Sequence, residues 1–307
     1  LTNGASLCGF TLTNGATRVV GDYPTFRQSS GGALWCESTN TVVVSNCVVT
    51  GNSAYLLGAG ASGGTLNNCT VSGNAGVYEG GGVSGCILNN CTLSGNAAEY
   101  GGGAYASTLN NCTVSGNAAV YEGGGVASCT LNNCIVHFNT AVQGANYDHG
   151  STLNYSCTTP LPPGGNGNLS LDPQLASASH LSSASPCRRA GNAAYASGAD
   201  IDGETWASPP SIGCDEYHPG AVIGPLNVAI AASFTNVATG FTVQLTALIE
   251  GRTTASVWDF GDGITVTNQP YTAHAWTALG DYAVVLRAFH ESQPGGSSAT
   301  LSVHVVA

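Results

Sequence analysis

The sequence predicts an all-β protein: a right-handed parallel β-helix over residues 1–218, followed by an immunoglobulin-like β-sandwich over residues 219–307. Two observations predict the β-helix. One phrase recurs five times between residues 42 and 139, and each copy alternates apolar and polar residues in short runs. A third observation predicts the sandwich, because glycine thins out after residue 218 and longer alternating runs appear, as in residues 241–248.

The repeated phrase has the form TLNNCTVSGN, as at residues 65–74. Its cysteines, with that of a looser sixth copy, are separated by 22, 22, 21, 22 and 23 residues: Cys47, Cys69, Cys91, Cys112, Cys134 and Cys157. A unit of this length is too short for two packed helices, but it suits one turn of a solenoid of short strands. Glycine runs such as 80–82 also disfavour helix. The units therefore predict parallel rungs stacked about 4.8 Å apart.

In-register stacking places equivalent side chains directly above one another. A buried amide costs free energy unless its donors and acceptors are paired, so stacked asparagines are expected to bond each other and the turn backbone. The leucines of the repeat, such as Leu66, are expected to fill the interior with the cysteine column. The two predicted amide ladders are Asn52, Asn74, Asn96, Asn117 and Asn139, and Asn46, Asn68, Asn90, Asn111 and Asn133.

The cysteines fall into two groups. Those of the repeat column, Cys69, Cys91, Cys112 and Cys134 among them, are interpreted as buried thiols that act as small hydrophobes, with inter-rung disulfides as the alternative. Cys187 and Cys214 lie outside the repeats in irregular sequence, and they are the predicted disulfide.

Composition limits the compartment and the partners. Charged residues make up 7% of the chain, the net charge is -11, lysine is absent and the six arginines form no cluster, which argues against nucleic acid and anionic membranes as partners. No apolar run is long enough to predict a membrane span. The composition is typical of a secreted β protein, so we expect an extracellular or cell-surface location. The chain opens in mid-pattern, and Leu1 is expected to follow a removed leader or truncated rungs.

The order of several blocks resembles a known family. The blocks are GFTLTNG, SGN followed by YGGG or YEGGG, NLSLDPQL, SPCRRAG, DIDGE and SIGCDEY, over residues 1–217. Together they resemble the bacterial choice-of-anchor Q proteins, which are extracellular parallel β-helices. Arg188 and Arg189 depart from the acidic residue that usually follows SPC in that family.

The second domain carries its own resemblance. WDFGDG at residues 258–263, HAW at 274–276 and GDYAV at 280–284 are similar to the signature of the PKD (polycystic-kidney-disease-type) domain. We expect Trp258 and Phe260 to alternate with Asp259 on a central strand, and the Gly-Asp-Gly turn to close a hairpin.

Two clusters are candidate sites. The dense acidic group is interpreted as carboxylates that cap turns, with a structural calcium ion as the alternative and no other cofactor expected: Asp200, Asp202, Asp215 and Glu216. Three tyrosines at one repeat position are interpreted as a structural stack or as a contact for glycan or protein: Tyr78, Tyr100 and Tyr121. No catalytic residue is assigned, since Glu79 and Glu122 share a repeat position two rungs apart with no basic residue nearby.

These observations favour a non-enzymatic extracellular structural or adhesive protein. An exposed strand edge at one end of the helix predicts head-to-tail self-assembly into a surface filament. The alternatives are a carbohydrate-binding surface protein that uses the tyrosines, and a polysaccharide lyase or glycoside hydrolase on the helix face.

Overall fold

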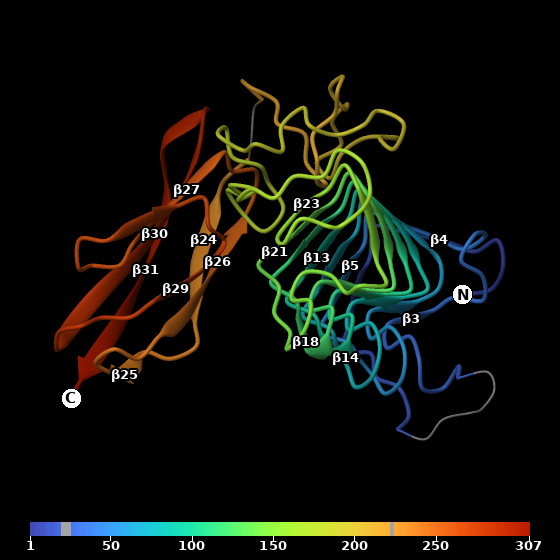
Figure 1. Cartoon of the computed structure of the whole chain (residues 1–307), viewed down its shortest axis with the longest axis horizontal. Helices are drawn as coiled ribbons and strands as arrows, with labels where there is room; N and C mark the ends of the chain where they lie inside the picture. The colour runs from blue at the N-terminus through green and yellow to red at the C-terminus, as the bar shows by residue number, and fades with distance from the viewer. Residues whose placement is uncertain (20–25, 222–223) are drawn as a thin grey trace. The chain divides into compact units, whose positions relative to one another are not determined.

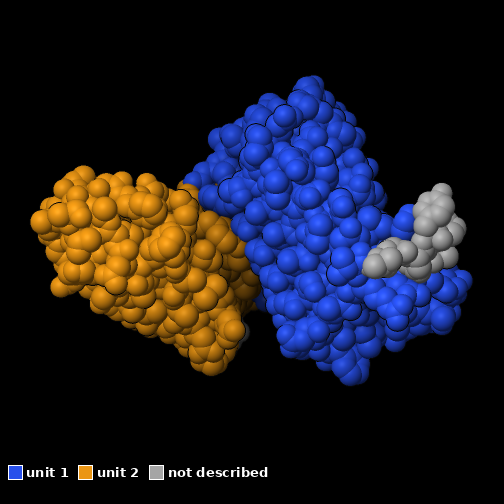
Figure 2. Space-filling model, turned by 90° about the horizontal axis from the view of Figure 1, so that it is seen from below, with its two compact units in different colours: residues 1–172, 187–216 blue, residues 173–186, 217–307 orange. Residues whose placement is uncertain are grey.

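A computed structural model describes residues 1–19, 26–221 and 224–307 (Figure 1). The chain divides into two compact units, one of residues 1–172 and 187–216 and the other of residues 173–186 and 217–307 (Figure 2). Both units are all-β, and no helix in the described residues has the length and apolarity needed to cross a membrane. The predicted fold classes, a β-solenoid and then a β-sandwich, are confirmed.

Two long parallel sheets carry the repeated phrase on either side of its Asn-Cys pair. The first has seven strands: β1 (Ser6–Cys8), β4 (Val43–Ser45), β8 (Thr65–Asn67), β12 (Ile87–Asn89), β16 (Thr108–Asn110), β20 (Thr130–Asn132) and β22 (Thr152–Asn154). The second also has seven: β2 (Thr11–Thr13), β5 (Val48–Thr50), β9 (Thr70–Ser72), β13 (Thr92–Ser94), β17 (Thr113–Ser115), β21 (Ile135–His137) and β23 (Cys157–Thr158).

Two shorter parallel sheets close each turn. The first has four strands: β6 (Ser53–Ala54), β10 (Ala75–Gly76), β14 (Ala97–Tyr100) and β18 (Ala118–Glu122). The second has five: β3 (Leu34–Trp35), β7 (Ala61–Ser62), β11 (Val83–Ser84), β15 (Ala104–Tyr105) and β19 (Val126–Ala127). The glycine runs lie between these two sheets, where a Cβ on Gly102 would stand 2.2 Å from the carbonyl oxygen of Ala118 on the next rung. The backbones approach too closely there for any side chain.

The predicted amide ladder joins the rungs. Asn74 Nδ2 donates to Asn96 Oδ1 at 2.9 Å, and Asn96 Nδ2 donates to Asn117 Oδ1 at the same distance. Asn96 Nδ2 also donates to Val71 O at 2.9 Å, and its Oδ1 accepts the Asn74 backbone N–H. The ladder continues to Asn139, whose Nδ2 reaches Asn146 Oδ1 at 3.2 Å. These buried amides therefore pair their donors and acceptors along the whole stack.

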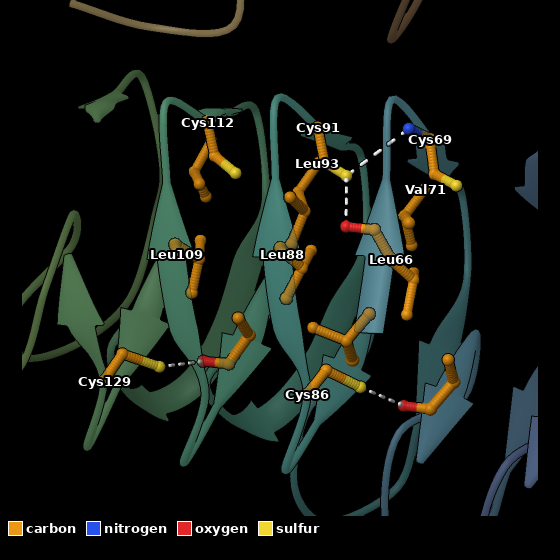
Figure 3. Packing of buried hydrophobic residues seen from close by; sticks show 14 of the residues in the cluster. Leu66, Cys69, Val71, Cys86, Leu88, Cys91, Leu93, Leu109, Cys112 and Cys129 are labelled. Atoms are coloured by element: carbon orange, nitrogen blue, oxygen red, sulfur yellow. Dashed lines mark hydrogen bonds between the residues drawn. The ribbon is translucent and has the colours of Figure 1, made fainter. Parts of the chain in front are cut away.

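The core consists of stacked leucines, valines and cysteines. Figure 3 shows Leu66, Leu88 and Leu109 in one column beside the cysteines. The column cysteines are thiols, as predicted, and Cys91 Sγ accepts the Cys69 backbone N–H at 3.4 Å. Cys86 and Cys129, at a second repeat position, are also buried thiols. Burial raises the pKa of Cys129 to about 12, which keeps that thiol protonated.

Cys157 does not continue the cysteine column, in contrast to the predicted spacing. The position above Cys134 belongs to Ser156, whose hydroxyl accepts the Cys134 backbone N–H at 3.1 Å, while Cys157 pairs with Ile135. The looser sixth copy thus keeps the 22-residue step with a serine in place of the cysteine.

The second asparagine set forms the corner of each rung. Asn46, Asn68, Asn90, Asn111 and Asn133 all have φ between 47° and 54°, the left-handed region that asparagine tolerates better than most residues. The side chains of the last four bind residues 187–216, which we call the strap, whereas Asn46 Nδ2 donates to Cys8 Sγ. Asn133 Nδ2 donates to Asn192 O at 2.9 Å, Asn111 Nδ2 to Tyr195 O at 2.8 Å, and Asn90 Nδ2 to Ala199 O at 2.7 Å. The strap therefore runs back along the solenoid over successive corners.

The second unit is a two-sheet sandwich. One sheet has three strands: β24 (Asn227–Ala232), β26 (Val243–Glu250) and β29 (Tyr271–His274). The other has five: β25 (Asn236–Ala238), β31 (Gln293–Val306), β30 (Gly280–His290), β27 (Ala255–Asp259) and β28 (Thr265–Thr267). Trp258 and Phe260 are buried while Asp259 is exposed, and β27 pairs antiparallel with β28, as the sequence predicts.

The signature residues of the sandwich contact one another. The His274 ring stacks on Phe260 at a centroid distance of 4.1 Å, and His274 Nε2 donates to Asp262 Oδ2 at 2.7 Å. Trp276 Nε1 donates to Phe260 O at 3.0 Å. Partial burial alone would raise the pKa of Asp262, but the bonds from His274 and from the Ile264 N–H outweigh it and hold that pKa below its usual value.

The amide ladder gives the first prediction. Asn96→Ala removes the acceptor of the buried Asn74 backbone N–H and of one Asn74 side-chain N–H, and it removes the side-chain donor to Val71 O. We therefore expect it to lower the free energy of unfolding by about 3 kcal/mol in urea denaturation of the full chain. The control is Asn89→Ala, which removes a half-buried amide that bonds to Asn67 and Asn110. That loss should stay below about 1 kcal/mol. Equal losses would contradict the importance of the buried ladder.

The hydrogen-bonded pair of Asp262 and His274 gives the second prediction. Because the pKa of Asp262 is lower in the folded state, its stabilisation is present above the unfolded value near 3.8 and is lost as pH falls through the folded value. Asp262→Asn should therefore lower the melting temperature of the sandwich near pH 6, and the difference from wild type should vanish at strongly acidic pH. Asp259→Asn, on the exposed side of the same turn, is the control. A difference that does not depend on pH would refute the assignment.

Candidate functional site

An exposed apolar edge follows the shortest sheet of the solenoid. Tyr100 ends β14, Val120 and Tyr121 lie in β18, and Val77 and Tyr78 follow β10. With Val142, these six side chains, which we call the tyrosine edge, are between 38% and 80% exposed. Several large apolar side chains in a row on successive rungs are unusual for a surface that contacts only water, and such surfaces often serve as interaction sites.

A β-bulge shapes the edge. Ala98 pairs with Ala119, and Tyr100 pairs with Glu122, so Val120 and Tyr121 together stand opposite the single residue Glu99. Extra residues of this kind bend a strand and re-aim its side chains. The bulge explains why Val120 and Tyr121 are the more exposed, at 56% and 50%.

The predicted tyrosine register is wrong by one residue. Tyr100 pairs with Glu79 on one side and with Glu122 on the other, and so does not lie level with Tyr78 and Tyr121. The cause is the one 21-residue step, between Cys91 and Cys112. The rings nevertheless contact each other in pairs. The ring centroids of Tyr55 and Tyr78 are 5.4 Å apart, and those of Tyr100 and Tyr121 are also 5.4 Å apart.

Carboxylates accompany the rings. A hydrogen bond with Tyr55, together with the charge of Glu99, raises the pKa of Tyr78. Burial, and then the charge of Glu79 with a hydrogen bond to it, raises the pKa of Tyr105 in the adjoining sheet. The hydroxyls of Tyr78 and Tyr105 therefore remain protonated donors at neutral pH, beside carboxyl groups that can accept hydrogen bonds.

A shallow groove of about 280 Å³ opens at one end of the edge. It is lined by Tyr100, Tyr121, Glu122, Val142 and Gln143. The groove combines two aromatic faces, one carboxylate and one amide, which are groups that suit a ligand with both apolar faces and hydroxyls.

The acidic group has a structural role in the strap. Asp200 is fully buried, its Oδ1 accepts the N–H groups of Asp202 and Glu204, and its Oδ2 accepts that of Glu216. Burial raises the pKa of Asp200, while the bonds from the Glu204 and Glu216 N–H groups lower it. The Glu216 carboxylate in turn accepts the N–H and the hydroxyl of Ser211, each at 2.8 Å, as expected of carboxylates that cap turns.

The other members of the group differ in exposure, since Asp215 is buried and Asp202 is exposed. Calcium at this group stays a prediction, and the melting temperature with and without added calcium would measure it.

The predicted disulfide is not formed. Cys187 and Cys214 are both thiols, and each sulfur has a different neighbour. Cys214 Sγ lies 3.3 Å from Thr92 Oγ1, whereas Cys187 hydrogen-bonds Cys157. The strap places the two cysteines over different rungs, which the spacing of the sequence could not indicate.

Sequence reasoning missed two surface features. The valines of the tyrosine edge are one, although Val77 and Val120 directly precede two of the tyrosines. The other is a hollow of about 340 Å³ beside Arg18 and Arg27, where the Arg27 guanidinium lies 4.3 Å from the centre of the Trp35 ring and 3.5 Å from Glu37. No sequence pattern links these arginines to Trp35, so this hollow could not be found from the sequence.

Comparison with known proteins identifies the two folds. A family model described as "Right handed beta helix region" matches residues 4–159, which is half of the chain. The chain belongs to this right-handed β-helix family. A second family model, "PKD domain", matches residues 227–305, so the β-helix is followed by a PKD domain, as predicted. The narrower choice-of-anchor Q label stays a prediction.

Two solved structures show partial similarity. One is described as the structural basis for the promiscuous specificity of carbohydrate-binding modules from the β-sandwich superfamily; it is 25% identical with a TM-score of 0.25, and covers 27% of this chain and 35% of that one. The chain thus spans about a third of that structure's length. The other is the PKD domain of the human VPS10 domain-containing receptor SorCS2, at 25% identity and a TM-score of 0.24, covering 30% of this chain and 82% of that one. The search of curated proteins found no match.

A β-helix joined to a PKD domain fits an extracellular surface protein, since PKD domains are typical of such proteins.

Proposed function

We propose that the protein is a non-enzymatic structural and adhesive protein of the cell exterior, in which the β-helix is a rigid support and the tyrosine edge is the contact surface. The observation that carries the proposal is the exposure of this edge along successive rungs. The amide ladder and the strap hold the rungs beneath it in one register, so the contact groups are presented in a fixed order.

An uncharged polysaccharide is the partner that this surface suits best. The apolar faces of sugar rings pack on tyrosine rings, and sugar hydroxyls donate to carboxylates such as Glu122 and accept from tyrosine hydroxyls. The carboxylates Glu79, Glu99 and Glu122 would repel an acidic polymer, and the chain has no lysine to offset them.

The register also favours binding over catalysis. Glu79, Tyr100 and Glu122 pair in succession, so a full rung lies between the two glutamates and their backbones are about 10 Å apart at the usual strand spacing. Paired carboxylates in glycosidases lie about 5–9.5 Å apart. A lyase or hydrolase remains the alternative, and release of new reducing or unsaturated ends from a polysaccharide would establish it.

Self-assembly is the finer form of the proposal. Because the strands of the first long sheet from β4 to β20 pair in register with neighbours on both sides, a further copy could add to an end of the stack in the same way. Sedimentation of the full chain over a range of concentrations measures this directly, and a monomer throughout would contradict it.

The binding surface gives the third prediction. In a screen of immobilised uncharged polysaccharides, Tyr121→Ala should weaken binding roughly tenfold or more, the usual cost of truncating a central aromatic contact. Glu122→Gln should weaken binding less, because it keeps an acceptor. The control is Phe234→Ala, which removes an exposed aromatic ring from the sandwich.

Three results would overturn the glycan assignment. They are wild-type protein that binds no uncharged polysaccharide, a Tyr121→Ala variant that binds as well as wild type, and an equal loss in Phe234→Ala. Preference for an acidic polymer would also count against the charge argument.

A further inference from the structure

One outward-facing column of the solenoid is buried although it does not point into the core. Thr92, Thr113, Ile135 and Cys157 pair with one another in register on β13, β17, β21 and β23. Their neighbours along the strands, such as Leu93 and Val114, face the core. All four column residues are at most 3% exposed, because the strap covers them.

The strap can be followed rung by rung along this column. Cys214 Sγ lies 3.3 Å from Thr92 Oγ1, and Cys214 N donates to Thr113 Oγ1 at 3.2 Å. Gly213 lies so close to the next rung that a Cβ there would be 2.8 Å from Ile135 Cδ1.

Ile212 N then donates to Cys187 O at 2.9 Å. The order of these contacts places Cys187 at the following rung, where the column residue is Cys157. Both cysteines are fully buried, and their side chains are hydrogen-bonded to each other.

We propose that Cys157 and Cys187 form a disulfide when the protein folds in an oxidising compartment. This rests on the extracellular location proposed above. The pair differs from the cysteine column inside the solenoid, where side chains on stacked parallel strands point in the same direction. Cys157 points outward from its strand and Cys187 belongs to the strap that covers this face, so the two side chains approach each other from facing elements, as a disulfide needs.

The chemistry is a thiol–disulfide exchange. The thiolate of one cysteine attacks an external disulfide such as oxidised glutathione, forming a mixed disulfide and releasing one external thiolate. The second cysteine then attacks the mixed bond, which closes the Cys157–Cys187 bond and releases the second external thiol. The two cysteines together lose two electrons and two protons, and the external disulfide is reduced to two thiols.

The bond would fasten the strap to the last rung. It closes a loop from residue 157 to residue 187, and the strap contacts beyond Cys187 would then begin at a covalently fixed point. A cross-link of this kind restricts the unfolded chain and should raise the melting temperature of the oxidised protein over the reduced protein.

The experiment uses the full chain, refolded in a glutathione redox buffer so that the result does not depend on where the protein resides. Remaining thiols are alkylated under denaturing conditions without reductant, and the chain is cleaved on the amino side of aspartate. Cleavage before Asp172 separates fragments 148–171 and 172–199, each of which contains one cysteine. We expect these fragments to appear as one cross-linked species, lighter than the two reduced fragments by two hydrogens.

Two serine variants supply the controls. Cys187→Ser should lose the cross-link and the fall in melting temperature that reductant causes, whereas Cys214→Ser should keep both. Alkylation of both Cys157 and Cys187 in the folded, oxidised protein would overturn the proposal, and so would a Cys187–Cys214 cross-link. Neither result would affect polysaccharide binding at the tyrosine edge, so the two proposals can fail separately.

Discussion

The amide ladder is the interaction on which the rest of the solenoid depends. Each buried asparagine both donates to and accepts from its neighbours, so a side chain that would be costly to bury becomes a link between rungs. An amide one residue out of place would leave donors unpaired in the core. The ladder therefore enforces the in-register stacking that also aligns the leucines and cysteines.

The same constraint produces the outer surfaces. Because the rungs keep one register, the left-handed corner asparagines form a straight column of amide donors, and the strap occupies it with its carbonyl groups. On another face the register is relaxed by a bulge, and there valine and tyrosine side chains stand out into solvent. The candidate contact surface thus arises where the repeat is least regular.

The parts that the sequence predicts well are those governed by periodicity. The solenoid, the Asn96 ladder and the cysteine column follow from a repeat of constant length, and the PKD domain follows from a local signature. Periodicity failed where the step changes: one shortened repeat moved Tyr100 level with Glu79, and Ser156 took the position expected for Cys157.

The strap could not be predicted for a different reason. Its path depends on contacts between residues far apart in the chain, such as Asn90 with Ala199, and neither segment carries a pattern that points to the other. The predicted partner of Cys187 was wrong for this reason. The side-chain amides of the corner asparagines can donate to any backbone carbonyl group, so they do not specify which segment of the chain will cover them.

The length of the strap is also matched to the number of solenoid rungs that it covers. Its residues Asn192, Tyr195 and Ala199 meet three consecutive corners, so between these corners it advances by three or four residues per rung, and the next corner, Asn68, contacts Asp200 O. Tandem repeats readily gain or lose units by duplication and deletion. Here a gain of one 22-residue rung beneath the strap would shift every later corner out of step unless the strap lengthened as well, so the number of covered rungs is coupled to a second, distant segment of the gene.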